Sequence, residues 1–521
     1  MLEKLACLGL PLWLVACGAA AGPPPAAAPN AANAAGSDAA SGGEPGPSRA
    51  ASEAPRGLPP ADPACAAYAG AAASGCPAGD LTEQLAAALS LSGAERDAQL
   101  RCMEHAQSTP AGVIRALRAD LAPRGCGDVV VGSEGSMPRA PQATREVADA
   151  LVALRVGAQL YRSVQNPPLP RAPFDKATFL KHFKEVLSPW IAEQARAVDA
   201  LSKVGPRLSG YGKAVVALEA GLADMRFVTV ARSIALPDEM KSDPEIRETY
   251  LVALEQALEP RVARGRDAAL VGLGELSRHG VTSDVRLFEA RQLLSELYAG
   301  RRIDALDKLL LPALPDLDTS SAALKVAAKL PAFYALKLSA SPNVVDPKLL
   351  RARMEQGVPP GLWLGQLPTE PALAALAQRA LFQLGQTYFW AEPFGRAAAV
   401  KVPAQDRDAA LLGALAKLLA KGPRNAAAMM LGPPTLPPEL RDTTELDALA
   451  KDKTASAGLA EFDAAYVRGL APPANDPAFW KEQATRYQRA HKKLADKAAQ
   501  ERAAELAKAA QDTEKELRSH R

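Results

Sequence analysis

Apolar residues recur at helical spacing over most of the chain, and the alternation typical of half-buried strands is nearly absent. Between residues 143 and 164, for example, Val147, Leu151, Leu154 and Ala158 follow one another at intervals of three and four residues. This spacing places them on one face of a helix. Further segments of this kind are broken by proline and glycine, so the pattern predicts an all-α protein.

Several helix boundaries can be read from capping residues. Asp80-Leu-Thr-Glu83 has the form of a capping box that opens a helix to Leu89. Asp243-Pro244 and Asp476-Pro477 place an aspartate at the N-cap and a proline in the first turn. We also expect helices over 174–201, with a kink at Pro189, and over 209–236, with helical segments continuing through 304–311.

The C-terminal segment favours one long helix from Asp476 to about Ser519, which would extend roughly 60 Å at 1.5 Å per residue. Its apolar stripe is thin, and charges of both signs cover the remainder. It is either a solvated helix or a partner-binding or coiled-coil segment, although strict heptads are not sustained.

These segments divide the chain into consecutive regions. A small cysteine-containing helical unit is expected at 63–131, with helices over 94–106 and 110–122 and a short strand at Val129–Val131. A linker at 132–142 leads into a helical array. The remaining regions are the array at 143–340, a second helical region at 341–470 and the long charged helix at 475–521.

One stretch of the second helical region resembles a known repeat. Leu384-Gly385-Gln-Thr-Tyr388, with Ala397 nine residues later, is similar to the core of a tetratricopeptide repeat over about 372–404. Lys401 and Ala409 depart from that pattern, and no steady 34-residue period is found. The resemblance implies an α-solenoid of helical hairpins with a concave binding surface; the alternative is an irregular helical array. Tyr388, Phe389 and Trp390 are the candidate residues of a binding groove, and a helical core position is the alternative for them.

The N-terminus carries a second resemblance. The apolar run Leu5–Ala16 matches a signal peptide and is too short to span a membrane, which takes about 20 residues. Leu14-Val15-Ala16-Cys17 resembles the lipobox of bacterial lipoproteins. That resemblance implies removal of residues 1–16, lipid attachment at Cys17 and a location in the cell envelope. It also implies the outer membrane, facing the periplasm or the cell surface, because Gly18 stands where aspartate marks inner-membrane retention. An ordinary secretory signal is the alternative.

Residues 18–62 are dominated by alanine, proline, glycine and serine, with no large aliphatic residue before Leu58. A segment of this composition cannot bury enough apolar surface to offset its ordering entropy. We therefore expect a disordered tether between the lipid and the first helical unit.

Four cysteines remain after Cys7 and Cys17, and they are Cys65, Cys76, Cys102 and Cys126. An even number clustered in an exported chain predicts two disulfides. Three connectivities are possible, and the most local pairing, Cys65–Cys76 with Cys102–Cys126, is favoured. A zinc site that includes His105 is the alternative.

No motif of a known reaction is present. The five histidines, His105, His182, His279, His491 and His520, form no HExxH, and neither GxSxG nor a phosphate-binding loop occurs. The balance of 61 basic and 58 acidic residues gives no reason to expect nucleic-acid binding. No cofactor or metal is predicted, and the oligomeric state stays open.

The sequence therefore favours a lipid-anchored envelope protein that binds other envelope proteins as a helical interaction or scaffold module. The alternative is an enzyme that acts on envelope polymers such as peptidoglycan, with a catalytic set dispersed along the chain. A deep groove that holds a buried aspartate or glutamate among convergent polar groups would favour the enzyme.

Overall fold

The computed structural model describes residues 61–69, 75, 78–104, 110–132, 145–172, 174–298, 305–313, 321–339, 371–388, 391–403, 405–422, 436–454 and 456–520. The lipobox, residues 18–60 of the expected tether, Cys76 and His105 lie outside these ranges. Every regular element within them is helical, which confirms the all-α prediction.

The N-terminal unit is a set of short helices. It contains η3 (Pro63–Cys65), α2 (Ala66–Ala69), α3 (Leu81–Ser90), α4 (Gly93–Glu104), α5 (Ala111–Leu121), η4 (Arg124–Cys126) and α6 (Gly127–Val131). The predicted capping box is present, because Asp80 accepts from the Glu83 amide and Glu83 accepts from the Asp80 amide. The strand expected at Val129–Val131 is wrong: these residues complete α6, with Val130 and Val131 buried. Their β-branched side chains fill a helical core position, and packing overrides their strand propensity.

The local disulfide pairing is also wrong, because Cys65 is bonded to Cys126, 61 residues away. The chain folds back so that α6 packs against α2, which brings the two ends of the unit together. Both cysteines are buried. Cys102, on α4, is disulfide-bonded as well.

The helical array follows and is built around α10 (Gly210–Ser233) and α12 (Pro244–Arg278). The other elements are α7 (Arg145–Ser163), α8 (Lys176–His182), η7 (Phe183–Leu187), α9 (Ser188–Val204), η8 (Gly205–Arg207), α11 (Asp238–Lys241) and α13 (Val285–Leu297). The kink expected at Pro189 takes the form of the π-helical turn η7 directly before it. Proline cannot donate a backbone hydrogen bond, and a wider turn accommodates that loss.

The segment 304–311 is not the helix that its apolar spacing suggests. Only the 3-10 turn η9 (Leu306–Lys308) is helical within the described residues 305–313, and Leu309 is extended. Pro312 follows and disfavours helical backbone in the residue before it. We call residues 305–313 the strap. After it, α14 (Ala322–Lys329) packs on α3, and α15 (Ala332–Ser339) packs on α5.

The C-terminal half comprises α18 (Pro371–Tyr388), α19 (Ala391–Ala399), α20 (Arg407–Leu419), η10 (Pro438–Arg441), α22 (Thr444–Leu449), α23 (Ser456–Gly469), α24 (Pro477–Lys493) and α25 (Lys497–Ser519). The single long C-terminal helix is wrong, since α24 and α25 are separate helices packed against each other. Leu494 turns extended, and Asp496 caps α25 by accepting from the Ala499 amide. On α25 the contact face of this hairpin is a row of alanines, with Ala499, Ala503 and Ala507 buried.

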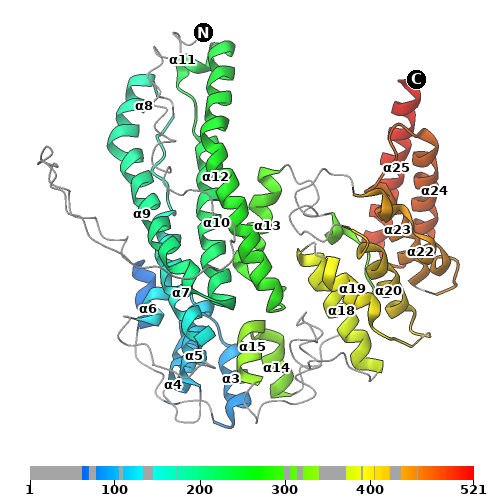
Figure 1. Ribbon diagram of the computed structural model, residues 1–521, viewed down its shortest axis with the longest axis horizontal. Coiled ribbons are helices and arrows are strands. Elements are labelled where there is room, and N and C mark those ends of the chain that lie inside the picture. Colours follow the sequence, from blue (N-terminus) through cyan, green and yellow to red (C-terminus); the bar gives the residue numbers. More distant parts are fainter. Residues whose placement is uncertain are drawn as a thin grey trace, which may run out of the picture.

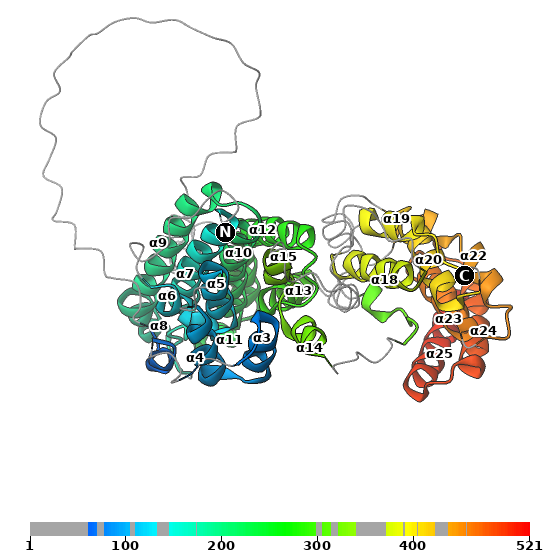
Figure 2. The same ribbon diagram turned by 90° about the horizontal axis from the view of Figure 1, so that it is seen from below.

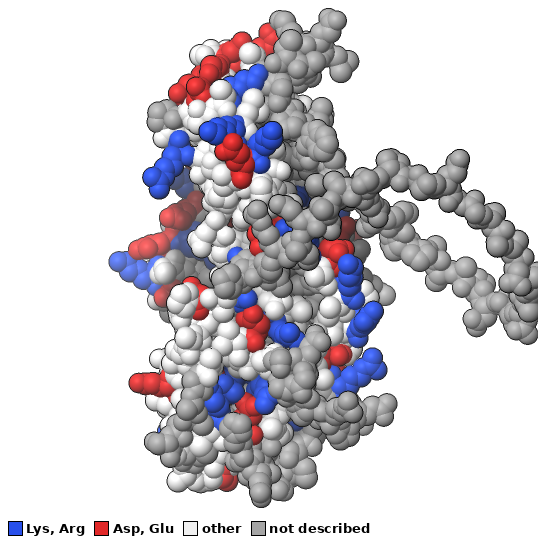
Figure 3. Space-filling view, turned by 90° about the vertical axis from the view of Figure 1, so that its left-hand side faces the viewer, with Lys and Arg blue, Asp and Glu red and all other residues white. Residues whose placement is uncertain are grey.

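The helices form two halves with a gap between their ribbons, and the N-terminal unit lies at one end of the array (Figure 1). One hydrophobic cluster runs from Leu85 in α3 to Ala507 in α25, so the N-terminal unit is part of the array's core. On the face shown in Figure 3, basic and acidic side chains are interspersed over the described elements.

Candidate functional site

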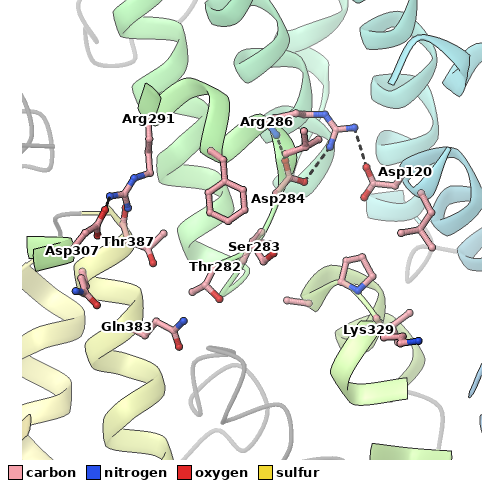
Figure 4. A pocket seen from close by; sticks show the side chains of 18 residues that line it. Asp120, Thr282, Ser283, Asp284, Arg286, Arg291, Asp307, Lys329, Gln383 and Thr387 are labelled. Atoms are coloured by element: carbon pink, nitrogen blue, oxygen red, sulfur yellow. Dashed lines mark hydrogen bonds and ion pairs between the residues drawn. The ribbon is translucent and has the colours of Figure 1, made fainter. Parts of the chain in front are cut away.

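A cleft of about 900 Å3 lies between the two halves. Its walls come from the end of α5, the loop from α12 to α13, the first turns of α13, the strap, the link from α14 to α15, and α18. Arg286, Asp284 and Asp120 lie together on one side, and Arg291, Asp307 and Thr387 lie together on another (Figure 4).

The first side is a hydrogen-bonded set of buried charges. The Arg286 guanidinium donates from Nη2 to Asp120 Oδ1 at 2.9 Å and from Nη1 to Asp284 Oδ2 at 3.1 Å. The Tyr211 hydroxyl donates to Asp120 Oδ2 at 2.6 Å. Both oxygens of Asp120 are therefore engaged, and its charge is paired with Arg286.

Burial is the strongest influence on the pKa values of Asp120 and Tyr211. It raises the pKa of the Asp120 carboxyl above its ordinary value, although the neighbouring Arg286 acts in the opposite direction. Burial, with the nearby Asp120 charge, also raises the pKa of the Tyr211 hydroxyl well above its ordinary value. Tyr211 is thus a neutral hydrogen-bond donor across the physiological pH range.

The set continues away from the cleft into the core. Arg286 Nε donates to Glu219 Oε1 at 3.2 Å, and Arg124 donates to both oxygens of Glu219 at 2.7 and 2.8 Å. Arg124 and Arg226 both pair with Glu289. The chain of ion pairs joins the N-terminal unit to α10 and α13, so it fixes the orientation of the cleft wall.

The rim beside these charges is apolar. Val285 and Phe288, in the first turn of α13, are 60% and 55% exposed. Single exposed apolar side chains are common, but these two line the same cavity and are one helical turn apart. An exposed phenyl ring beside a hydrogen-bonding wall is the kind of anchor that binding sites use.

The second side of the cleft is formed in part by the strap. Arg291 pairs with Asp307 of the strap and donates to the Thr387 carbonyl at 2.6 Å. Gln386 Nε2 donates to the Leu306 carbonyl at 2.5 Å. Gln383, the exposed Lys329, Thr282 and Ser283 also belong to the polar lining of the cleft.

Of the candidate groove residues predicted from the repeat resemblance, Tyr388 lies among the described residues, and it does not line the cleft. Tyr388 is 2% exposed and its hydroxyl donates to the Val281 carbonyl, so it packs α18 against the loop after α12. Phe389 and Trp390 lie outside the described residues, as does Cys17. The segment itself is a hairpin of α18 and α19, in which Gly385 lets the Phe394 ring approach its backbone.

Sequence reasoning missed the cleft because its residues come from segments far apart in the chain. Asp284 was the best available signal, since it caps α13 by accepting from the Arg286 and Leu287 amides. An aspartate cap followed by Val285 and Leu287 predicts a helix start, however, and nothing in this stretch of sequence points to Asp120.

No protein-family model matches the chain, and no curated protein or solved structure matches it either. Within the described ranges, no three histidine, cysteine, aspartate or glutamate side chains gather as metal ligands would. No helix there combines the length and the apolar composition that a membrane crossing needs.

Proposed function

We propose that this protein is a lipid-anchored cell-envelope protein whose helical array is an interaction module, with the cleft as its partner-binding site. The observation that carries the proposal is the cleft lining: Val285 and Phe288 are exposed beside a wall of hydroxyl, amide and guanidinium groups. Interfaces are built from such an aromatic anchor within a polar surround.

The location rests on the lipobox resemblance at Cys17 and on the tether composition of residues 18–62. The disulfide between Cys65 and Cys126 supports folding in an oxidising compartment, where such bonds persist. A lipid anchor at Cys17 with a tether of this length would keep the cleft close to a membrane surface.

The test is site-specific photo-cross-linking in living cells, with a benzophenone amino acid at Phe288. A matched control carries the same group at Val252, which is 53% exposed on α12 and outside the cleft lining. We expect a discrete cross-linked adduct from position 288 and none from position 252. Equal labelling at both positions, or none at 288, would refute the cleft as the partner site.

The anchor has its own test. Cys17→Ser removes the sulfur that would carry the lipid, so the variant should not incorporate the labelled fatty acid that the wild-type protein takes up in living cells. Equal fatty-acid labelling of the variant and the wild type would contradict lipid anchoring at Cys17. It would leave the cross-linking result unaffected, because that experiment reports on the cleft alone.

A second candidate is an enzyme that acts on envelope polymers. The observation that favours it is Asp120, a buried carboxyl with a raised pKa in the cleft wall, with Tyr211 and Arg286 converging on it. Such shifted carboxyls are used as general acids. Asp120→Asn, which conserves shape, should then abolish hydrolysis of purified peptidoglycan by the protein; absence of any hydrolysis by the wild type would exclude this candidate.

A further inference from the structure

The strap belongs by sequence to the N-terminal half but packs in the C-terminal half. It lies between α13 and α14, and α14 packs on α3 of the N-terminal unit. The green strap nevertheless lies beside the yellow helix α18 of the other half (Figure 2). The chain thus makes an excursion into the C-terminal half and returns.

The strap is held there mainly by side chains that bond its backbone. The Leu310 amide donates to Asp463 Oδ1 at 2.8 Å, and the Tyr466 hydroxyl donates to the Ala305 carbonyl at 2.7 Å. Gln386 and Arg379 of α18 donate to the carbonyls of Leu306 and Pro312.

Two leucines anchor the strap in the core. Leu306 is fully buried and Leu309 is 6% exposed. Because buried backbone groups must find partners, the α18 and α23 side chains replace the bonds that a helix would have supplied.

Asp463 of α23 accepts a hydrogen bond from the strap, and the Arg502 charge acts on the same carboxyl. It is fully buried, its Oδ2 has no partner within the described residues, and burial raises the pKa of its carboxyl well above the ordinary value. A buried carboxyl with one unpartnered oxygen costs stability, so the bond to the strap is its visible function.

The strap also forms part of the cleft. Four residues that hold the strap or its neighbouring helices also line the cavity. Arg291 of α13 pairs with Asp307 of the strap and donates to the Thr387 carbonyl of α18, and Gln386 of α18 donates to the strap. Releasing the strap therefore removes contacts at the wall of the cleft itself.

We propose that the strap is a latch: its bonds to α18 and α23 hold the C-terminal half against the array and set the width of the cleft. The latch does not depend on what the cleft binds. It rests on the described contacts, so it can stand even if the proposed function fails.

The test uses the full-length protein with its disulfides intact. Fluorophores attached through genetically encoded keto amino acids at two exposed positions, Ser202 on α9 and Glu505 on α25, report the distance between the halves by single-molecule energy transfer. The unlatched variant combines Asp463→Leu with Tyr466→Phe. These changes remove the α23 carboxyl that accepts from the strap and the α23 hydroxyl that donates to it.

Two controls match it. Asp463→Asn retains an acceptor oxygen for the Leu310 amide, and Tyr487→Phe removes a hydroxyl in the same bundle that makes no hydrogen bond to the described residues of the strap. We expect the distance distribution of the unlatched variant to broaden about twofold, as hinge motion between domains would produce, and the controls to keep the wild-type width.

Hydrogen exchange of α24 and α25 separates unlatching from unfolding. Slow exchange retained in these helices, together with a broadened distribution, supports the latch. An unlatched variant with protected helices and the wild-type distribution overturns it. If α24 and α25 lose protection in the double variant, the single variant Tyr466→Phe, which keeps the ring in place, is measured instead. With these helices protected, a broadened distance distribution supports the latch and the wild-type distribution overturns it.

Discussion

Helices α10 and α12 pack closely together, and their packing depends on glycine. A Cβ atom added at Gly272 of α12 would lie 2.6 Å from Leu218 Cγ, 2.9 Å from the Leu218 amide nitrogen and 3.0 Å from the Ala214 carbonyl oxygen. Backbone atoms of α10 cannot move aside as a flexible side chain could. Gly272→Ala therefore forces the two helices apart.

Gly274, two residues later in the same helix, supplies the control. It is exposed, and a Cβ added there meets nothing within 4 Å. Both changes gain the helix propensity of alanine over glycine, about 1 kcal/mol. Only Gly272→Ala also pays the overpacking penalty, which is about 1–3 kcal/mol in a well-packed core.

The difference between the two variants isolates the packing term, because the propensity gain cancels. We expect Gly272→Ala to be less stable than Gly274→Ala by about 1–3 kcal/mol, with Gly274→Ala at or above the wild type. The measurement is the urea midpoint and slope of each variant, followed by far-ultraviolet circular dichroism. Equal midpoints for the two variants would show that α10 and α12 are not packed backbone to backbone.

Three other changes test separate parts of the fold. Glu219→Gln removes the acid that pairs with two arginines in the buried network, and should lower the free energy of unfolding by about 3–5 kcal/mol in urea titration; a loss below 1 kcal/mol, on the scale of exposed ion pairs, would argue against the buried network. Replacing Cys65 and Cys126 with serine opens a loop closed over 61 residues and should cost about 4 kcal/mol; an unchanged melting temperature would contradict that bond. Burial lowers the pKa of His279, although Glu146 opposes the shift, so its contribution to stability is complete above the unfolded value near 6.5 and is lost as the pH falls below it. Melting temperatures between pH 7 and 5 should therefore fall less steeply in His279→Gln, and parallel curves would refute this assignment.

Local signals predicted the helices well. The capping box at Asp80 and the Asp-Pro starts at Asp243 and Asp476 are all present, because each needs only the backbone amides of the next three residues. These interactions are complete within one turn of chain, so sequence spacing specifies them.

Features that depend on contacts between segments far apart in the sequence could not be predicted in this way. The Cys65–Cys126 bond follows from the fold-back of α6 onto α2, and a preference for local pairing had no information about that path. The strap shows the same limit. Its apolar spacing suits a helix, and only side chains of α18 and α23, more than 65 residues away in sequence, make an extended backbone tolerable there.

The cleft could not be predicted for a related reason. Asp120 and Arg286 are 166 residues apart, and neither stands in a motif. Charged residues are common in this chain, with 58 acids alone, so pairs among them carry no signal before the fold places them together. Exposure of Phe288 is likewise a tertiary property, since its position in α13 would suit a core as well.

The disulfide also has a consequence for the proposed anchor. A lipid on Cys17 would transmit any pull along the tether to residue 61 and the short η3 turn, which by themselves make few contacts. Cys65, in that turn, is bonded to Cys126 beside α6, and α6 packs on α7 of the array. Arg124, in the same η4 turn as Cys126, pairs with the buried Glu219. Force on such a tether would therefore reach the buried ion network and the core directly, and would bypass the fraying expected of a short terminal helix.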